Sequence, residues 1–263
     1  MTIRVGIGGW EFAPWRGEFY PAGLPHAREL EYASRRLTTI EINGTFYRTQ
    51  SATSFRKWRD ATPDDFVFAV KGHRNVVNSR KLSEAGEGID WFFKSGILEL
   101  GDKLGPVLWQ FAPFKKFNSE DFGAFLKLLP HEAGGRALRH AVEVRSKSFL
   151  VPEFTALLRE HNVAAVYADS GEHPNIGDVT ADFVYARLQG TTEENDTGYG
   201  AADLDRWTER TRLWESGGAP DDLPQIEKKA PPKTSRPVFI YMISGAKARA
   251  PAAAVALIER LKK

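Results

Sequence analysis

The sequence predicts a single (β/α)8 TIM-like barrel, an α/β fold in which helices surround eight parallel strands. Eight short runs that are apolar almost throughout recur along the 263 residues, as expected for strands buried on both faces. Most segments between these runs have helical periodicity, and barrels of this type commonly contain about 250 residues. The predicted strands are Ile3–Ile7, Thr38–Ile42, Phe66–Val70, Pro106–Trp109, Ala141–Val144, Ala164–Ala168, Phe183–Ala186 and Val238–Ile243.

The segments between these runs indicate helices at most positions. An apolar stripe between Phe122 and Leu129 marks one helix, and Pro152 suits the first turn of the next, where its missing N–H costs no hydrogen bond. The segment Ser170–Asp182 is too polar and too rich in glycine and proline to predict a helix. No repeat or linker divides the chain, so we expect one domain over residues 1–263, with a loop insertion near 217–236.

Composition excludes several kinds of chemistry. The chain has no cysteine, which excludes disulfides, thiolate catalysis, zinc–cysteine sites and iron–sulfur clusters. Its six histidines lack the spacings typical of metal ligands, so we expect no tightly bound metal. No motif indicates an organic cofactor, and none is expected.

Charge and hydropathy limit the partners. The net charge of +2 is too small to indicate a polyanionic partner by itself. No apolar run reaches the roughly 18 residues that a spanning helix needs, and no leader-like segment precedes the first predicted strand. We therefore expect a cytoplasmic protein with no membrane partner, and the oligomeric state is left open.

Polar and aromatic residues follow each predicted strand. In a (β/α)8 barrel the carboxyl ends of the strands meet at the face that carries the chemistry. Candidate site residues at or near these ends are Trp10, Glu41, Asn43, Tyr47, Lys71, Gln110, Glu143, Arg145, Asp169 and Arg187.

Two pairs among these residues deserve separate interpretation, because residues two apart on a strand share one face. Glu41 and Asn43 form one pair, and Glu143 and Arg145 form the other. A buried ionised side chain is costly unless it is paired, so one hypothesis is a structural ion-pair network with Lys71 or Arg187. The alternative is that the same network leaves one end free for a ligand.

The loops around this mouth favour an anionic ligand. Basic residues such as Lys115 and Lys247 alternate with rings such as Phe114. Barrels often bind phosphate at turns after the last two strands, where backbone amides and a helix start converge. Gly190 and the Ser244-Gly245 pair occupy these turns, so we expect phosphate between Gly190–Thr192 and Ser244–Ala246, with Arg187 or Lys247 as its charged partner.

Several strings together resemble the YecE-like family, the domain of unknown function 72 (DUF72). The strings are Gly8-Gly9-Trp10, Trp15-Arg16-Gly17, Phe19-Tyr20-Pro21, Glu41-Ile42-Asn43, Thr45-Phe46-Tyr47, Trp58 before Thr62-Pro63, Phe66–Lys71, Lys103–Pro106, Gln110, Ala141–Arg145, Asp169 and Tyr185–Arg187. The resemblance extends from end to end of the chain. It implies a TIM-like barrel, and the family has no established activity.

The chain also departs from the family's pattern. Asn78 stands where the family commonly has a histidine, and Gln189 replaces a second histidine after strand seven. In the family, strand eight commonly ends in asparagine and aspartate residues, and here Ser244 and Gly245 stand at that place. Phe149 stands where the family has a tryptophan. The replacements at the two histidine positions hydrogen-bond without titrating near neutral pH, which argues against proton transfer or metal binding there.

Two functional hypotheses follow. The first is an enzyme that acts on a phosphorylated or otherwise anionic small molecule or on a nucleic-acid end. Lys71, Arg145 and Arg187 would hold the anion. Glu41 or Glu143 would be the general base, and Asp169 would orient a partner. The second is a non-catalytic barrel that binds a metabolite or nucleic acid.

Overall fold

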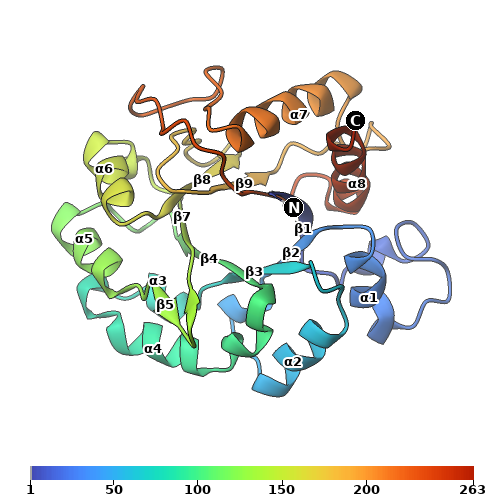
Figure 1. Cartoon of the computed structure of the whole chain (residues 1–263), viewed down its shortest axis with the longest axis horizontal. Coiled ribbons are helices and arrows are strands. Elements are labelled where there is room, and N and C mark those ends of the chain that lie inside the picture. Colours follow the sequence, from blue (N-terminus) through green and yellow to red (C-terminus); the bar gives the residue numbers. More distant parts are fainter. Residues whose placement is uncertain (1) are drawn as a thin grey trace.

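The computed structural model describes residues 2–263, so that residue 1 of the predicted domain lies outside them. Eight strands close into a barrel with the order β1-β10-β9-β8-β7-β4-β3-β2, and every neighbouring pair is parallel (Figure 1). The predicted barrel is confirmed, and each predicted run overlaps one strand. The strands are β1 Ile3–Gly8, β2 Thr39–Ile42, β3 Val67–Lys71, β4 Leu104–Phe111, β7 His140–Val144, β8 Ala164–Asp169, β9 Val184–Leu188 and β10 Val238–Met242.

Helices form the outer ring around these strands (Figure 1). Ser51 and Asn118 cap two of them by accepting a hydrogen bond from the backbone N–H three residues later, and Pro152 begins a third as predicted. Residues 170–183, between β8 and β9, contain no helix, as their composition indicated. No helix within residues 2–263 has the length and apolarity to cross a bilayer. The helices are α1 Glu29–Ser34, α2 Ala52–Asp60, α3 Arg74–Val77, α4 Gly86–Lys94, α5 Ser119–Leu128, α6 Pro152–Glu160, α7 Ala201–Glu215 and α8 Ala250–Leu261.

A small antiparallel hairpin, which the sequence analysis did not predict, precedes β7. Its strands are β5 Glu132–Ala133 and β6 Arg136–Ala137. Gly134 and Gly135 connect them at φ values of 59° and 74°, in the left-handed region that glycine adopts without strain. The Gly-Gly pair is the turn signal that could have indicated this hairpin.

The segment 216–237, which connects α7 to β10, has no regular helix or strand. It is nevertheless tied to the rest of the barrel. The carboxylate of Asp178 accepts from the N–H groups of Ile226 and Glu227, and within the segment the buried guanidinium of Arg236 donates to the carbonyl oxygens of Gly217 and Gly218. Its description as an insertion stays a prediction.

The barrel interior is built in layers, because alternate residues of each strand point inward. The middle of the barrel is apolar and includes Ala69, Ala141 and Tyr185. Two residues further along five of the eight strands the inward position is polar. The pairs are Thr39 and Glu41 on β2, Ala69 and Lys71 on β3, Leu108 and Gln110 on β4, Ala141 and Glu143 on β7, and Tyr185 and Arg187 on β9. The apolar layer therefore supports a charged layer at the carboxyl end of the barrel.

The close packing of β3 against β4 leads to a prediction. A Cβ atom added at Gly72 would lie 2.3 Å from Cε3 of Trp109, a wholly buried ring whose indole N–H donates to His140 at 3.1 Å. We expect Gly72→Ala to lower the free energy of unfolding in urea by about 1–3 kcal/mol, the usual cost of overpacking a core. Gly86→Ala is the matched control, because its Cβ would make an ordinary 3.5 Å contact with Leu128. Equal stability of the two variants would contradict this account of the core.

Candidate functional site

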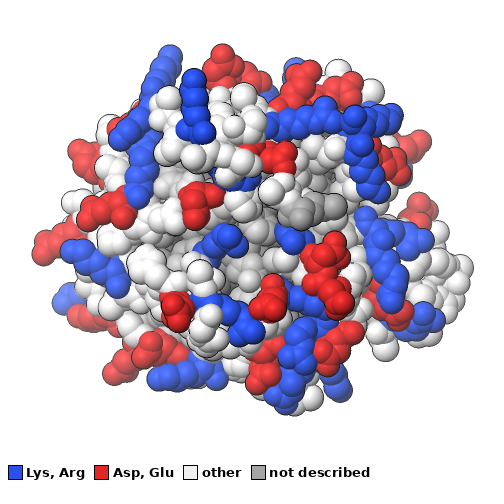
Figure 2. All heavy atoms as spheres, in the orientation of Figure 1, with Lys and Arg blue, Asp and Glu red and all other residues white. Residues whose placement is uncertain are grey.

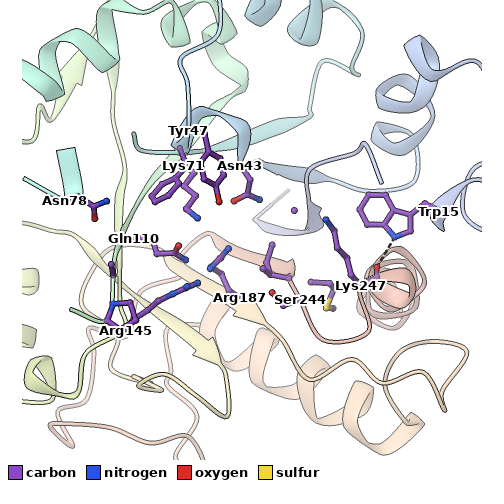
Figure 3. Close-up of a pocket in the computed structure, with 16 residues that line it drawn as sticks. Trp15, Asn43, Tyr47, Lys71, Asn78, Gln110, Arg145, Arg187, Ser244 and Lys247 are labelled. Atoms are coloured by element: carbon purple, nitrogen blue, oxygen red, sulfur yellow. Dashed lines mark hydrogen bonds between the residues drawn. The ribbon is translucent and has the colours of Figure 1, made fainter. Parts of the chain in front are cut away.

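A cavity of about 440 Å³ opens at the carboxyl end of the barrel (Figure 3). This volume lies within the usual range for small-molecule sites, which is about 300–1,000 Å³. Four cations line it: Lys71, Arg145, Arg187 and Lys247. Neutral polar side chains of Asn43, Tyr47, Asn78, Gln110 and Ser244 also line it. No Asp or Glu within residues 2–263 lines this cavity.

The floor of the cavity is organised by Arg187, which lies between two buried glutamates. The guanidinium donates to both carboxylate oxygens of Glu41, from Nε and Nη2 at 3.1 Å each, and donates from Nη1 to Oε2 of Glu143. Glu41, Glu143 and Arg187 are 0%, 1% and 2% exposed. Bidentate, charge-assisted bonds of this kind offset the cost of burying three charges.

Three further donors complete the hydrogen bonding of the two carboxylates. The hydroxyl of Tyr185 donates to Oε2 of Glu41 at 2.6 Å. Gln110 and Arg145 both donate to Oε1 of Glu143, at 2.7 Å and 3.0 Å. Every oxygen of the two carboxylates therefore has at least one partner. Because both carboxylates are buried and bonded to cations, this geometry favours the structural ion-pair hypothesis for both glutamates.

The pKa of Glu143 agrees with this pairing. Burial alone would raise the pKa of this carboxyl, but the charges of Arg187 and Arg145 and their hydrogen bonds hold it below its ordinary value. The same two glutamates, with Tyr185, raise the pKa of Arg187 despite its burial. Glu143 and Arg187 are thus held in their charged forms. The formal charges of the two arginines and two glutamates of this network sum to zero.

Lys71 differs from the arginines because no carboxylate is bonded to it. It ends β3, and its carbonyl oxygen accepts from the hydroxyl of Thr45 at 2.6 Å. The ammonium nitrogen lies 4.3 Å from the centre of the Phe46 ring and forms no hydrogen bond or ion pair with any of residues 2–263. Burial, and then the charge of Arg187, lower the pKa of Lys71 to about 8, against the opposing charges of Glu41 and Glu143.

Lys247 supplies the remaining cation from the loop after β10. Its carbonyl oxygen accepts from the indole N–H of Trp15 at 2.9 Å, which ties this loop to the one after β1. Its ammonium nitrogen lies 4.3 Å from the centre of the Phe12 ring, and burial lowers its pKa. Ser244, nearby in the same loop, adopts a φ of 66°, an uncommon conformation for a residue with a side chain.

The structure does not bring all of the predicted residues to the cavity. Trp10 packs against Trp58 and Phe68, with ring centres 5.0 Å and 6.4 Å away, on the helix side of the barrel wall. Asp169 faces Gly190, since a Cβ at that glycine would lie 3.0 Å from Oδ2 of Asp169. Trp10, Asp169, Gly190 and Gly245 therefore do not line the cavity. They lie in loops or, for Asp169, at the last position of β8, where contacts with neighbouring loops decide the side-chain position.

The phosphate position expected between the two glycine turns also needs correction, because the turns bond to each other. The N–H of Ala246 donates to the carbonyl of Thr191 at 2.8 Å, and a Cβ at Gly245 would lie 2.5 Å from the carbonyl oxygen of Gln189. The N–H of Gly190 donates to the hydroxyl of Tyr199 at 2.9 Å. These amides have partners already, and the space between the turns is filled by the backbone.

Trp15, Phe46 and Asn78 are among the lining residues that were missed as site residues. Trp15 and Phe46 belong to the strings that carry the family resemblance, and Asn78 stands at a position where that family commonly has a histidine. Each therefore had a signal in the sequence. Their loops do not have the strict alternation that identifies inward-facing strand residues.

Residues 2–263 contain no group of three or more His, Asp or Glu side chains arranged to hold a metal ion. His73 instead caps α3, accepting from the N–H of Asn75, and the buried His140 accepts from Trp109. The expectation of no tightly bound metal stays a prediction.

Comparison with known proteins identifies relatives along the whole chain. A sequence model described as "protein of unknown function DUF72" matches residues 4–263. A DUF72 family protein from Thermotoga maritima has a similar structure, with a TM-score of 0.75, 23% identity and full coverage of both chains. A second, from Enterococcus faecalis, has a TM-score of 0.70 and 16% identity over 99% of this chain and 96% of that one.

A curated relative is the UPF0759 protein YunF from Bacillus subtilis. It is 26% identical over 157 residues, which is 58% of this chain and 54% of YunF. The match thus spans about half the length of that relative. The structural similarities lie below 25% identity and show the fold alone.

The Arg187 network yields a first prediction for this site. We expect Arg187→Met to lower the free energy of unfolding by about 3–5 kcal/mol, because it leaves the buried Glu41 without a cationic partner and Glu143 with Arg145 alone. Adding Glu41→Gln and Glu143→Gln to that variant should recover most of the loss. Chemical denaturation of the four proteins, namely wild type, Arg187→Met, the double Gln variant and the triple variant, tests this. Wild-type stability of Arg187→Met would show that the network is not structural.

The free amine of Lys71 yields a second prediction. Because its surroundings disfavour the charged form, its ammonium should lose the proton at lower pH than an exposed lysine. Its rate of acetylation, followed by peptide mass spectrometry, should reach half its maximum near pH 8. Lys94, whose side chain is 79% exposed, is the internal reference for an exposed lysine. Identical profiles for the two lysines would contradict the environment described for Lys71.

Proposed function

The chain belongs to the DUF72 family of proteins of unknown function, and we propose that its cavity binds a small organic anion, with phosphorylated metabolites as the favoured class. The observation that carries the proposal is the excess of positive charge in this cavity. Four cations line it, and only two carboxylates, Glu41 and Glu143, lie beneath it. With all groups ionised, these six side chains sum to +2.

This excess is available to a ligand because the pairing is uneven. Arg187 is bonded to both glutamates, whereas Lys71 and Lys247 form no ion pair with any of residues 2–263. The side chain of Arg145 is 29% exposed and bonds Glu143 through Nε, which leaves its two terminal nitrogens as donors. An anion would gain charge-assisted hydrogen bonds from three groups on different sides of the cavity.

Neutral groups suit the uncharged part of such a ligand. Gln110 donates its amide hydrogen to Glu143, so its carbonyl oxygen is available to accept from a ligand hydroxyl. Asn43, Asn78 and Ser244 add further donors and acceptors around the rim. Several hydrogen-bonding groups beside a cationic site are typical of pockets for polar metabolites.

The charge distribution on the surface favours a small ligand over nucleic acid, the second candidate. Figure 2 shows Lys and Arg interspersed with Asp and Glu over the face that it displays, with no continuous basic band. The exposed Phe114 with Lys115 and Lys116 suits a nucleic-acid base, but Glu120 and Asp121 share the same shallow groove. Mixed charge weakens the attraction for a phosphate backbone. The proposal places the protein and its ligand in the cytoplasm.

Calorimetric titration with inorganic phosphate and with glycerol 3-phosphate tests the proposal. Both should bind in low-salt buffer, and Lys247→Gln should weaken binding by about tenfold or more, the effect of losing a charge-assisted hydrogen bond worth about 1.5–3 kcal/mol. Lys94→Gln, on the exposed face of α4, is the matched charge control and should bind like wild type. Absence of binding, or equal loss in the two variants, would refute the proposal.

A further inference from the structure

We propose that Lys71 acts as a nucleophile that captures the ligand as an imine, so that the bound anion is an aldehyde or ketone carrying phosphate or carboxylate. This inference rests on the proposed function, because the cations of the cavity must first hold the anionic group. It goes further by naming the reactive group of the ligand and the atom of the protein that attacks it.

The position of Lys71 carries the argument. As the last residue of β3 it points inward, and its carbonyl is held by Thr45, so its backbone is fixed. Figure 3 shows its amine directed into the cavity beside Asn43 and Tyr47. Although the residue is only 9% exposed, its nitrogen is not among the fully enclosed polar atoms without a partner, so a ligand can reach it.

The surroundings of Lys71 explain why its amine is not held by a counter-ion. The charged groups that face it are Glu41 on β2, Glu143 on β7, Arg187 on β9 and Arg145 after β7. Both glutamates are bonded to other donors, namely Arg187, Arg145, Gln110 and Tyr185, and neither forms a hydrogen bond with the amine. A buried lysine beside another cation is the arrangement that activates amines as nucleophiles.

The protonation of Lys71 supports this role. Burial and the charge of Arg187 lower its pKa to about 8, so about a tenth of the amine is neutral at pH 7. An exposed lysine with an ordinary pKa of about 10.4 is neutral in less than about one molecule in a thousand at that pH. The attacking form is therefore enriched by more than about a hundredfold. The face of Phe46 opposes this by favouring the ammonium, but it also holds the nitrogen within the cavity.

The chemical step is balanced without a further reactant. The nitrogen lone pair forms a bond to the carbonyl carbon, and the π electron pair of the C=O bond moves to oxygen. A proton passes from nitrogen to that oxygen to give a carbinolamine. The C–O bond then breaks, the oxygen leaves as water with a second proton, and the C=N bond forms. No oxidant or reductant is needed, and addition of water reverses the step.

Reductive trapping tests the inference on the wild-type chain. The protein is incubated with dihydroxyacetone phosphate or with pyruvate and then with sodium cyanoborohydride, which reduces an imine to a stable secondary amine. We expect one adduct per chain, with the mass of the carbonyl compound less one oxygen atom, located on Lys71 by peptide mass spectrometry. The two arms distinguish a phosphate-bearing from a carboxylate-bearing ligand. Lys71→Gln should lose the adduct at least tenfold, whereas Lys94→Gln should retain it.

Binding of glycerol 3-phosphate, which has no carbonyl group, separates the two proposals. Binding of this compound without any trapped adduct would overturn the imine and leave the anion site intact. Lack of both binding and trapping would overturn both proposals. Adducts spread over surface lysines at rates equal to that of Lys71 would also overturn the inference, because the cavity would then give the amine no advantage.

Discussion

Arg187 is held between Glu41 and Glu143, and the arrangement of the barrel mouth depends on this buried contact. The three residues come from β9, β2 and β7, so their bonds join separate parts of the barrel wall across its interior. The contact gives a counter-charge to both carboxylates, which are at most 1% exposed. It also removes the carboxylates as partners for Lys71, and that is why the cavity above retains unpaired positive charge.

The fold was largely predictable because its signal is local. A strand covered on both faces is apolar throughout, and eight such runs could be counted without knowledge of their contacts. The predicted ends of the strands were less accurate. The fourth strand, β4, spans Leu104–Phe111 rather than Pro106–Trp109, because the polar Gln110 lies inside the strand and donates a hydrogen bond to Glu143. The hairpin around Gly134 and Gly135 was missed because its two-residue strands have no apolar pattern.

The candidate site residues were predictable only on the strands, where alternation determines which side chains point into the barrel. Glu41, Lys71, Gln110, Glu143 and Arg187 occupy equivalent inward positions, and closure of the barrel brings them together. Trp10, Asp169, Gly190 and Gly245 lie in or beside loops, where packing against other loops determined the outcome. The sequence also could not show which cation pairs with the glutamates. That choice pairs Arg187 with both glutamates and leaves Lys71 without an ion pair among residues 2–263.

The central claim is that pairing of Arg187 leaves a cationic cavity open to an anion, and a crystal structure of the protein soaked in selenate at low ionic strength tests it most directly. The account predicts an anomalous selenium peak inside the cavity, within hydrogen-bond distance of Lys71, Arg145 or Lys247, with Arg187 still bonded to both glutamates. A peak only at the Gly190–Thr192 turn, or an anion bound by Arg187 after release of Glu41 and Glu143, would contradict it.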